Sequence, residues 1–210
     1  MSPETHLKGL YLITNADPLA QLLQKLDVAL ATKQVALLQY RRKHTPEQLR
    51  AAEIESILTL CQRHAVRLII NDQIQLAREF AVGVHLGQSD GCIGEARQSL
   101  GQGAIIGRTC GQSLALAQQA FADGASYVAF GAVYATSTKP EAKTLDLAVL
   151  STARQQLQIP ICTIGGLTVE NVAPVLAHGT DLCAVVGDVL DRPLQQIEAR
   201  VQAWGAQFAL

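Results

Sequence analysis

Acidic residues follow two consecutive apolar runs at a spacing that suits a metal site. Asn71-Asp72 comes directly after residues 66–70, and Asp90 comes shortly after residues 82–86. If these runs are adjacent parallel strands, their backbones lie roughly 4.8 Å apart, so both carboxylates could approach one hard cation. Mg²⁺ commonly binds one or two carboxylates and completes its shell with waters and substrate phosphate. We therefore expect Asp72 and Asp90 to bind Mg²⁺.

Each aspartate also has an ordinary structural explanation. Asp72 could cap the helix that follows it, and Asp90-Gly91 could form a turn, because aspartate is favoured in both places. Neither residue alone distinguishes these roles from metal binding.

Basic and hydroxyl side chains follow three other apolar runs. The second run ends in Gln39-Tyr40-Arg41-Arg42-Lys43, the fifth in Arg108-Thr109, and the sixth leads to Thr136-Ser137-Thr138-Lys139. Lysine and arginine are ordinarily solvated, so each segment alone is weak evidence. Cations and hydroxyl donors that converge beside a divalent ion, however, suit a pyrophosphate group.

Glycines follow the last two runs, where they indicate a second phosphate site. Gly165-Gly166 and Gly187 would let the backbone approach a ligand and aim amide N–H groups at it, although glycine after a strand is more often only a turn. His85, which lies within the fourth run, is predicted to be a structural histidine rather than a catalytic one.

Eight short apolar or β-branched runs recur along the chain and predict eight strands. They span residues 10–14, 35–39, 66–70, 82–86, 104–107, 127–130, 161–164 and 182–186, with helical spacing between them. Continuous apolar strands that alternate with amphipathic helices indicate a parallel sheet covered by helices. Eight such units predict an α/β fold, a single (β/α)₈ or TIM barrel, whose active site forms at the C-terminal ends of the strands.

A doubly wound open sheet is the alternative architecture. It is disfavoured because the segment after the first run, Thr14-Asn15-Ala16-Asp17-Pro18, lacks the G-x-G-x-x-G fingerprint of a dinucleotide fold. No linker or low-complexity stretch interrupts the chain, so residues 1–210 are predicted to form one catalytic domain. Its third and fourth helices must be short.

Composition narrows the choice of partners. The net charge of -1, the charged fraction of 17% and the aromatic fraction of 4% favour neither nucleic acid nor an anionic membrane. The five cysteines form no C-x-x-C pair, and no run of eighteen apolar residues occurs. We expect a reduced cytoplasmic protein that acts on small molecules. A homodimer is a hypothesis that no residue pattern supports.

Taken in order, the polar segments resemble the signature of the thiamine-phosphate synthase family. The resemblance covers nearly the whole chain: Tyr11-Leu12-Ile13-Thr14, Gln39-Tyr40-Arg41-Arg42-Lys43, Asn71-Asp72, Val84-His85-Leu86-Gly87-Gln88-Ser89-Asp90, Thr136-Ser137-Thr138-Lys139 and Ile164-Gly165-Gly166. It implies transfer of a 4-amino-2-methylpyrimidine-5-methyl group from its diphosphate to 4-methyl-5-(2-phosphooxyethyl)thiazole. The products would be thiamine phosphate and pyrophosphate.

The resemblance also implies roles for individual residues. Asp72 and Asp90 would bind Mg²⁺, and the catalytic cations that neutralise the departing pyrophosphate would be Arg41, Lys43 and Lys139. The pyrimidine diphosphate would contact Gln39, Arg41, Lys43, Asn71, Thr109 and Lys139. The thiazole phosphate would contact Thr136, Thr138, Gly166 and Gly187.

Several positions depart from the common family pattern. Thr109 stands where serine is usual and keeps the hydroxyl, Gly111 stands where histidine is frequent, and Ala132 stands where proline is frequent. Gly187-Asp188 replaces a common Ser-Ala pair. Gly187 therefore lacks a side-chain donor, and Asp188 would repel phosphate if it faced the site.

Two other functions compete with synthase activity. A related thiazole tautomerase is an isomerase that needs no grip on pyrophosphate, and a non-catalytic barrel would bind phosphate without turnover. Retention of Asn71-Asp72, Asp90, Arg41 and Lys43 favours the synthase. Gly111 supplies no histidine at the loop where the tautomerase is expected to carry its acid–base group.

Overall fold

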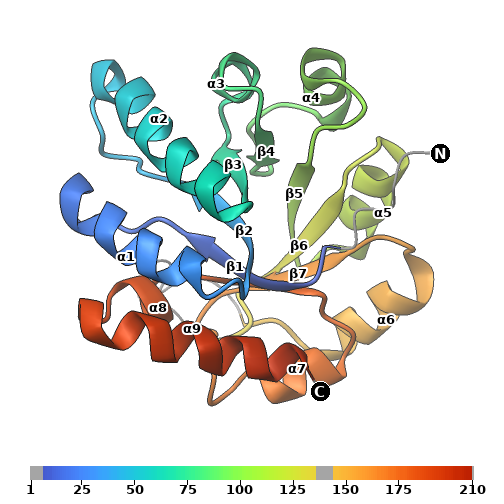
Figure 1. The fold of residues 1–210 in the computed structure, drawn as a ribbon. Helices are drawn as coiled ribbons and strands as arrows, with labels where there is room; N and C mark the ends of the chain where they lie inside the picture. The colour runs from blue at the N-terminus through green and yellow to red at the C-terminus, as the bar shows by residue number, and fades with distance from the viewer. Residues whose placement is uncertain (1–6, 136–143, 210) are drawn as a thin grey trace.

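Eight parallel strands close into a barrel surrounded by helices (Figure 1). The computed structural model describes residues 7–135 and 144–209. The strands are β1 Gly9–Ile13, β2 Val35–Tyr40, β3 Arg67–Asn71, β4 Gly83–Leu86, β5 Ile106–Gly111, β6 Tyr127–Gly131, β7 Ile161–Ile164 and β8 Leu182–Val185. Closure follows from the pairing of β1 with both β2 and β8. The predicted TIM barrel is confirmed.

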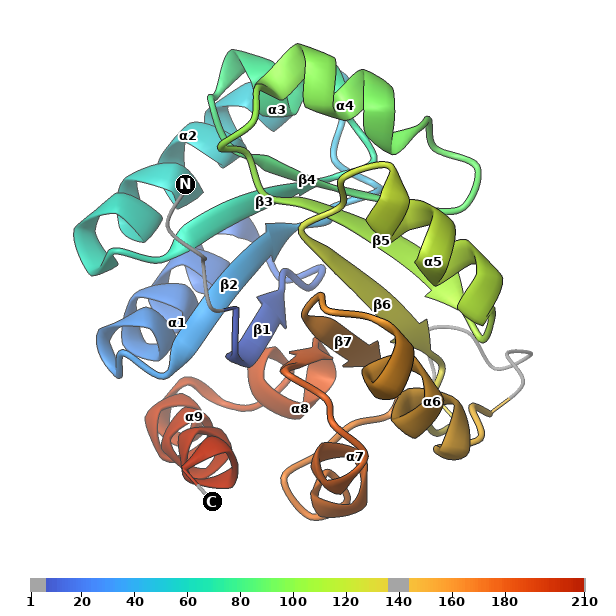
Figure 2. The same ribbon diagram turned by 90° about the vertical axis from the view of Figure 1, so that its right-hand side faces the viewer.

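Helices follow the strands and form the outer ring seen along the barrel in Figure 2. They are α1 Leu19–Ala31, α2 Glu47–His64, α3 Ile74–Glu79, α4 Ile93–Leu100, α5 Leu114–Ala122, α6 Ala148–Gln156, α7 Ala173–Ala177, α8 Gly187–Leu190 and α9 Leu194–Phe208. As predicted, the third and fourth helices are short, with 6 and 8 residues.

Each predicted apolar run forms a strand, but several strands continue into the polar residues that follow. β2 continues to Tyr40 and β3 to Asn71, while β5 starts later than predicted and extends through Arg108 and Thr109 to Gly111. The backbone ladder does not depend on side-chain polarity, and at the open end of a barrel polar side chains can face inward toward solvent. Apolar runs therefore mark only the buried parts of these strands.

Alternate strand residues divide between two cores. Side chains such as Leu22 and Trp204 pack between the barrel and its helices, whereas Tyr11, Ile69 and Tyr127 belong to a separate cluster inside the barrel. This division follows from the two-residue period of a strand. It also sets the side chains that face the open end: Gln39, Asn71, His85 and Thr109 lie on the inward-facing phase of their strands.

Gly107 makes room for the ring of Tyr127 inside the barrel. A Cβ at position 107 would lie 2.1 Å from Cζ of Tyr127 and 2.4 Å from its hydroxyl oxygen. Neither atom can retreat easily, because Tyr127 is fully buried and its ring packs edge-on against Tyr11 with centroids 5.8 Å apart.

We expect Gly107→Ala to destabilise the protein by about 1–3 kcal/mol, because overpacking a filled core forces side chains off their rotamers. Equilibrium unfolding in urea, followed by circular dichroism, would measure the change in unfolding free energy. Gly103→Ala is the matched control, since a Cβ there meets no atom within 4 Å. Equal stabilities of the two variants would contradict the packing argument.

Candidate active site

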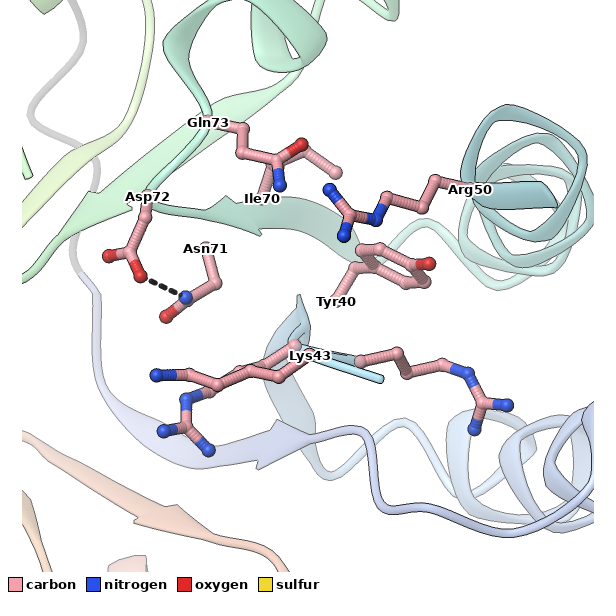
Figure 3. A pocket seen from close by; sticks show the side chains of 9 residues that line it. Tyr40, Lys43, Arg50, Ile70, Asn71, Asp72 and Gln73 are labelled. Carbon is pink, nitrogen blue, oxygen red and sulfur yellow. Dashed lines mark hydrogen bonds between the residues drawn. The ribbon is translucent and has the colours of Figure 1, made fainter. Parts of the chain in front are cut away.

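A pocket of about 270 Å³ opens at the C-terminal ends of β2 and β3. Figure 3 shows Lys43 extending along the same side as Asn71 and Asp72, while Arg50 reaches in from α2. Arg50 was not anticipated, because nothing in its helical segment distinguishes it from a solvated arginine. The remaining lining residues are Tyr40, Arg41, Arg42, Ile70 and Gln73.

Glu53 on α2 anchors the segment that carries the predicted cations. Its carboxylate accepts hydrogen bonds from Tyr40 Oη at 2.8 Å, Arg42 Nε at 2.9 Å and Thr45 Oγ1 at 3.0 Å. Burial alone would raise the pKa of Glu53, but hydrogen bonds from Arg42, Tyr40 and Thr45 outweigh burial and lower it. The carboxylate is therefore ionised and pairs with Arg42. Tyr40 and Arg42 thus face α2.

Arg42 also ties this segment to the loop after β1. Its Nη1 donates to the carbonyl oxygens of Asn15 at 2.9 Å and Asp17 at 2.8 Å. The neighbouring residue Arg41 is held through its backbone, which donates to Thr14 Oγ1 at 2.8 Å. Two loops at the mouth of the barrel are therefore fixed to each other beside the pocket.

Asp72 and Asp90 converge, as the sequence predicts, beside Gly87. The position that a Cβ on Gly87 would occupy lies 2.2 Å from Asp90 Oδ2 and 3.5 Å from Asp72 Oδ1. Among the described residues no group of three or more histidine, cysteine or acidic side chains is placed to hold a metal. Two hard carboxylate donors that leave most of the coordination shell to other oxygens fit Mg²⁺.

The capping role considered for Asp72 is wrong. The helix α3 begins after Gln73 without a side-chain cap, and Asp72 Oδ1 instead accepts from the backbone N–H of Gly87 at 3.1 Å. Its Oδ2 accepts from the amide of Asn71. Asp72 also has a φ of 63°, a left-handed conformation that is uncommon for residues other than glycine, although aspartate adopts it more readily than most.

Arg108 lies near the carboxylate pair, but its guanidinium donates hydrogen bonds to the backbone of the loop after β4. The Nη1 and Nη2 atoms donate to the carbonyl oxygens of Gly91 at 2.7 Å and of Gln88 at 3.0 Å. These carbonyls flank Asp90, whose own N–H donates to Gly87 O at 3.3 Å in a turn. Asp90 therefore closes a turn that begins at Gly87, earlier than the Asp90-Gly91 turn that the sequence suggested, and its carboxylate lies beside Asp72.

A chain of hydrogen bonds crosses the interior of the barrel. Gln39 Nε2 donates to Tyr11 Oη at 2.7 Å, and the Tyr11 and Tyr127 hydroxyl oxygens lie 2.8 Å apart. His85 Nδ1 lies 2.9 Å from Tyr127 Oη, and His85 Nε2 lies 2.8 Å from Thr109 Oγ1. Gln39, expected to contact substrate, is only 2% exposed and has its amide nitrogen bonded to Tyr11.

Both ring nitrogens of His85 thus have protein partners, which agrees with the predicted structural role. Burial, together with repulsion from Arg108 and Arg41, lowers the pKa of His85 to about 4. The imidazole is therefore neutral at physiological pH.

The glycines after β7 are required by the neighbouring loop. A Cβ on Gly165 would lie 2.6 Å from the Cβ of Ala132, and one on Gly166 would lie 2.5 Å from the carbonyl oxygen of Ala135. Both glycines have positive φ, 107° and 64°. Close contact between the loops after β6 and β7 accounts for this pair, in addition to any contact with a ligand.

Asp188 faces away from the mouth of the barrel. Its carboxylate accepts from Trp204 Nε1 at 2.7 Å and from Arg200 Nε at 2.9 Å, both on α9. The repulsion of phosphate considered above does not apply to this orientation. At Gly187 a Cβ would lie 2.6 Å from Asp191 Oδ2, and Asp191 is held by Asn15 Nδ2 at 3.0 Å. Glycine at 187 therefore leaves the space that the Asp191 carboxylate occupies while it accepts from Asn15.

Three predicted site residues, Thr136, Thr138 and Lys139, lie outside the described residues. Within the described ranges, no helix is both long and apolar enough to cross a membrane. All five cysteines are free thiols, and four of them are buried.

Comparison with known proteins places this geometry in context. A family model described as thiamine monophosphate synthase matches residues 10–189. A thiamine phosphate pyrophosphorylase from Pyrococcus furiosus is similar in structure, with a TM-score of 0.85 and 24% identity over 98% of this chain and 97% of that one. A thiamine phosphate pyrophosphorylase from Bacteroides thetaiotaomicron has a TM-score of 0.68 and 18% identity, over 95% and 96% of the two chains. A 3-hexulose-6-phosphate synthase is also similar in structure, with a TM-score of 0.69 and 15% identity over 95% of this chain and 99% of that one.

We expect Gly87→Ala to weaken binding of Mg²⁺, because the added Cβ would displace the Asp90 carboxylate from its position beside Asp72. Isothermal titration with Mn²⁺ in the presence of pyrophosphate would measure the affinity, which we expect to fall about ten-fold or more, the range seen when partners that orient metal ligands are lost.

Gly94→Ala is the control for that experiment, since a Cβ there meets only Cys92 Sγ at 3.9 Å and lies in the same part of the barrel. Unchanged metal affinity in Gly87→Ala would remove the carboxylate pair from the metal site.

Proposed function

Because the chain belongs to the thiamine monophosphate synthase family, we propose that it joins a pyrimidine diphosphate to a thiazole phosphate. The substrates are 4-amino-2-methyl-5-(diphosphooxymethyl)pyrimidine and 4-methyl-5-(2-phosphooxyethyl)thiazole, and the products are thiamine phosphate and pyrophosphate. The observation that carries the proposal is the convergence of Asp72 and Asp90 at one point beside a pocket lined by Arg41 and Lys43. This pairing of anionic and cationic groups suits a metal-bound diphosphate.

The reaction replaces one bond at the exocyclic methylene carbon of the pyrimidine. The C–O bond to the diphosphate breaks with its electron pair on oxygen, and the thiazole nitrogen forms a C–N bond with its lone pair. That nitrogen carries no proton, so the step needs no general base. The protein must chiefly stabilise the charge that develops on the departing pyrophosphate.

Residues at the ends of β2 and β3 are suited to this task. Arg41 and Lys43 would contact the diphosphate, and Asn71 would position Asp72, to which its amide donates. Asp72 and Asp90 would hold Mg²⁺, which when bound would neutralise part of the charge on the leaving group. Lys139 is proposed as a third catalytic cation, and Thr109 as a hydroxyl donor. Gln39 would contribute its amide from the floor of the site.

The thiazole phosphate is proposed to bind across the ends of β6, β7 and β8. Its partners would be Thr136, Thr138 and the backbone at Gly166 and Gly187. The outward orientation of Asp188 supports this assignment, because it removes a negative charge from the phosphate pocket.

The tautomerase alternative receives no comparable support. Gly111, at the position where an acid–base histidine would be expected, has a φ of 60° and provides no side chain. A non-catalytic barrel would not need two carboxylates and a set of cations to converge. Both alternatives predict no pyrophosphate release.

The proposal also includes the protein's cellular location, its domain bounds and its oligomeric state. A cytoplasmic location fits four buried thiols that form no disulfide, and the domain is taken as residues 1–210. The homodimer remains a hypothesis.

The decisive assay measures pyrophosphate and thiamine phosphate with each substrate alone and with both. We expect equal amounts of the two products only when both substrates and Mg²⁺ are present, and loss of activity in excess EDTA that Mg²⁺ restores. Pyrophosphate release from the pyrimidine diphosphate alone would indicate a hydrolase, and full turnover in EDTA would exclude the metal.

We expect Lys43→Ala to lower kcat by ~10²-fold, because removal of one preorganised charge stabiliser typically costs a few kcal/mol in the transition state. Steady-state kinetics would measure the change. Lys8→Ala, at an exposed residue just before β1, should retain wild-type kcat. A kcat for Lys43→Ala that matched this control would make Lys43 a surface lysine.

A further inference from the structure

The chain of hydrogen bonds inside the barrel has a direction that its first residue determines. Gln39 Nε2 can only donate, so the oxygen of Tyr11 accepts its hydrogen bond. The single phenol proton of Tyr11 is then available for Tyr127, whose oxygen lies 2.8 Å away. The Tyr127 oxygen then accepts a hydrogen bond from Tyr11, and the Tyr127 hydroxyl donates to His85 Nδ1 at 2.9 Å.

The same reasoning continues through His85 to Thr109, near the C-terminal end of β5. A histidine that accepts at Nδ1 carries its proton on Nε2 when the ring is neutral. Nε2 therefore donates to Thr109 Oγ1, which lies 2.8 Å away. Because Thr109 Oγ1 accepts from His85, the proton of the Thr109 hydroxyl is available for a further acceptor. Thr109 is half-buried, whereas the other four members of the chain are buried.

We propose that this chain fixes the Thr109 hydroxyl as a donor toward the ligand, so that Tyr11, Tyr127 and His85 act as positioning residues. The ligand's identity rests on the proposed function. Diphosphate oxygens only accept hydrogen bonds, so a Thr109 hydroxyl fixed as a donor suits them, whereas one that presented a lone pair would not. A donor oriented before the substrate binds costs no reorganisation during the reaction.

Packing around the chain supports a fixed arrangement. The rings of His85 and Tyr127 stack with centroids 5.6 Å apart, and Gly107 leaves the space that Tyr127 occupies. The five residues come from five different strands, β2, β1, β6, β4 and β5. The inference concerns the direction of hydrogen bonds and requires no group to change its protonation state.

The opposite direction makes a distinct and measurable prediction. If the amide oxygen of Gln39 faced Tyr11, each donor and acceptor along the chain would exchange roles. Neutral His85 would then carry its proton on Nδ1, and Thr109 would donate to Nε2 and present a lone pair to the ligand. The tautomer of His85 therefore reports the direction.

Two-bond ¹H–¹⁵N correlation spectra of the ligand-free protein, labelled with ¹⁵N-histidine, distinguish the two neutral tautomers. The resonances of His85 are assigned by their loss in His85→Gln. We expect the Nε2–H tautomer in the wild type. The Nδ1–H tautomer would overturn the proposal. Because no substrate is present, this result does not depend on whether the protein is a synthase.

Kinetics of a double-mutant cycle test whether the chain acts through Thr109. We expect Thr109→Val to raise KM for the pyrimidine diphosphate or lower kcat by about ten-fold or more, since a hydrogen bond to a charged group is lost, and Thr109→Ser to restore activity. Tyr127→Phe should have a smaller effect in the wild type and almost none in Thr109→Val. Additive effects would overturn the positioning role; if Tyr127→Phe does not fold, the tautomer measurement decides alone.

Discussion

Closure of the eight strands is the constraint on which the site depends. Once β1 pairs with β8, every strand must send alternate residues into an interior that has no other access than its two ends. Apolar residues such as Leu37 and Ile69 fill the middle of that interior. The last inward residues of neighbouring strands therefore meet at the C-terminal end, which brings together polar groups that lie far apart in the chain.

Several charged groups around this end of the barrel hold its loops in place. Arg42 with Glu53, Lys25 with Asp17, and Asp188 with Arg200 are ion pairs in which at least one side chain is mostly buried. Such pairs must be well hydrogen-bonded, because a buried charge without a partner is costly. Here they fix the loops after β1, β2 and β8. The loops around the pocket are thus held by ion pairs, and one of their members, Arg42, also lines the pocket.

The sequence was sufficient for the order of strands, the barrel and the convergence of Asp72 with Asp90, because all three follow from short-range periodicity and from the geometry of parallel strands. It could not reveal which polar residues have protein partners. Gln39 and Arg108 are residue types that often bind ligands, yet Gln39 donates a hydrogen bond to Tyr11 and Arg108 donates to backbone carbonyls. Glu53 lies within a helix, 8 to 13 residues after its three partners, and no pattern in that helix indicates that it contacts them. These depend on distances between elements, which no pattern along one segment encodes.

The contact between Gly107 and Tyr127 has a consequence for how the sequence can change over time. A side chain larger than hydrogen at 107 crowds the phenol ring, and a small residue at 127 alone leaves a cavity inside the barrel. Each single substitution costs stability or the hydrogen bonds of the ring, so we expect the two positions to change together. We expect a bulkier residue at 107 to be tolerated best beside a smaller residue at 127, a pair that would also lack the connection between Tyr11 and His85.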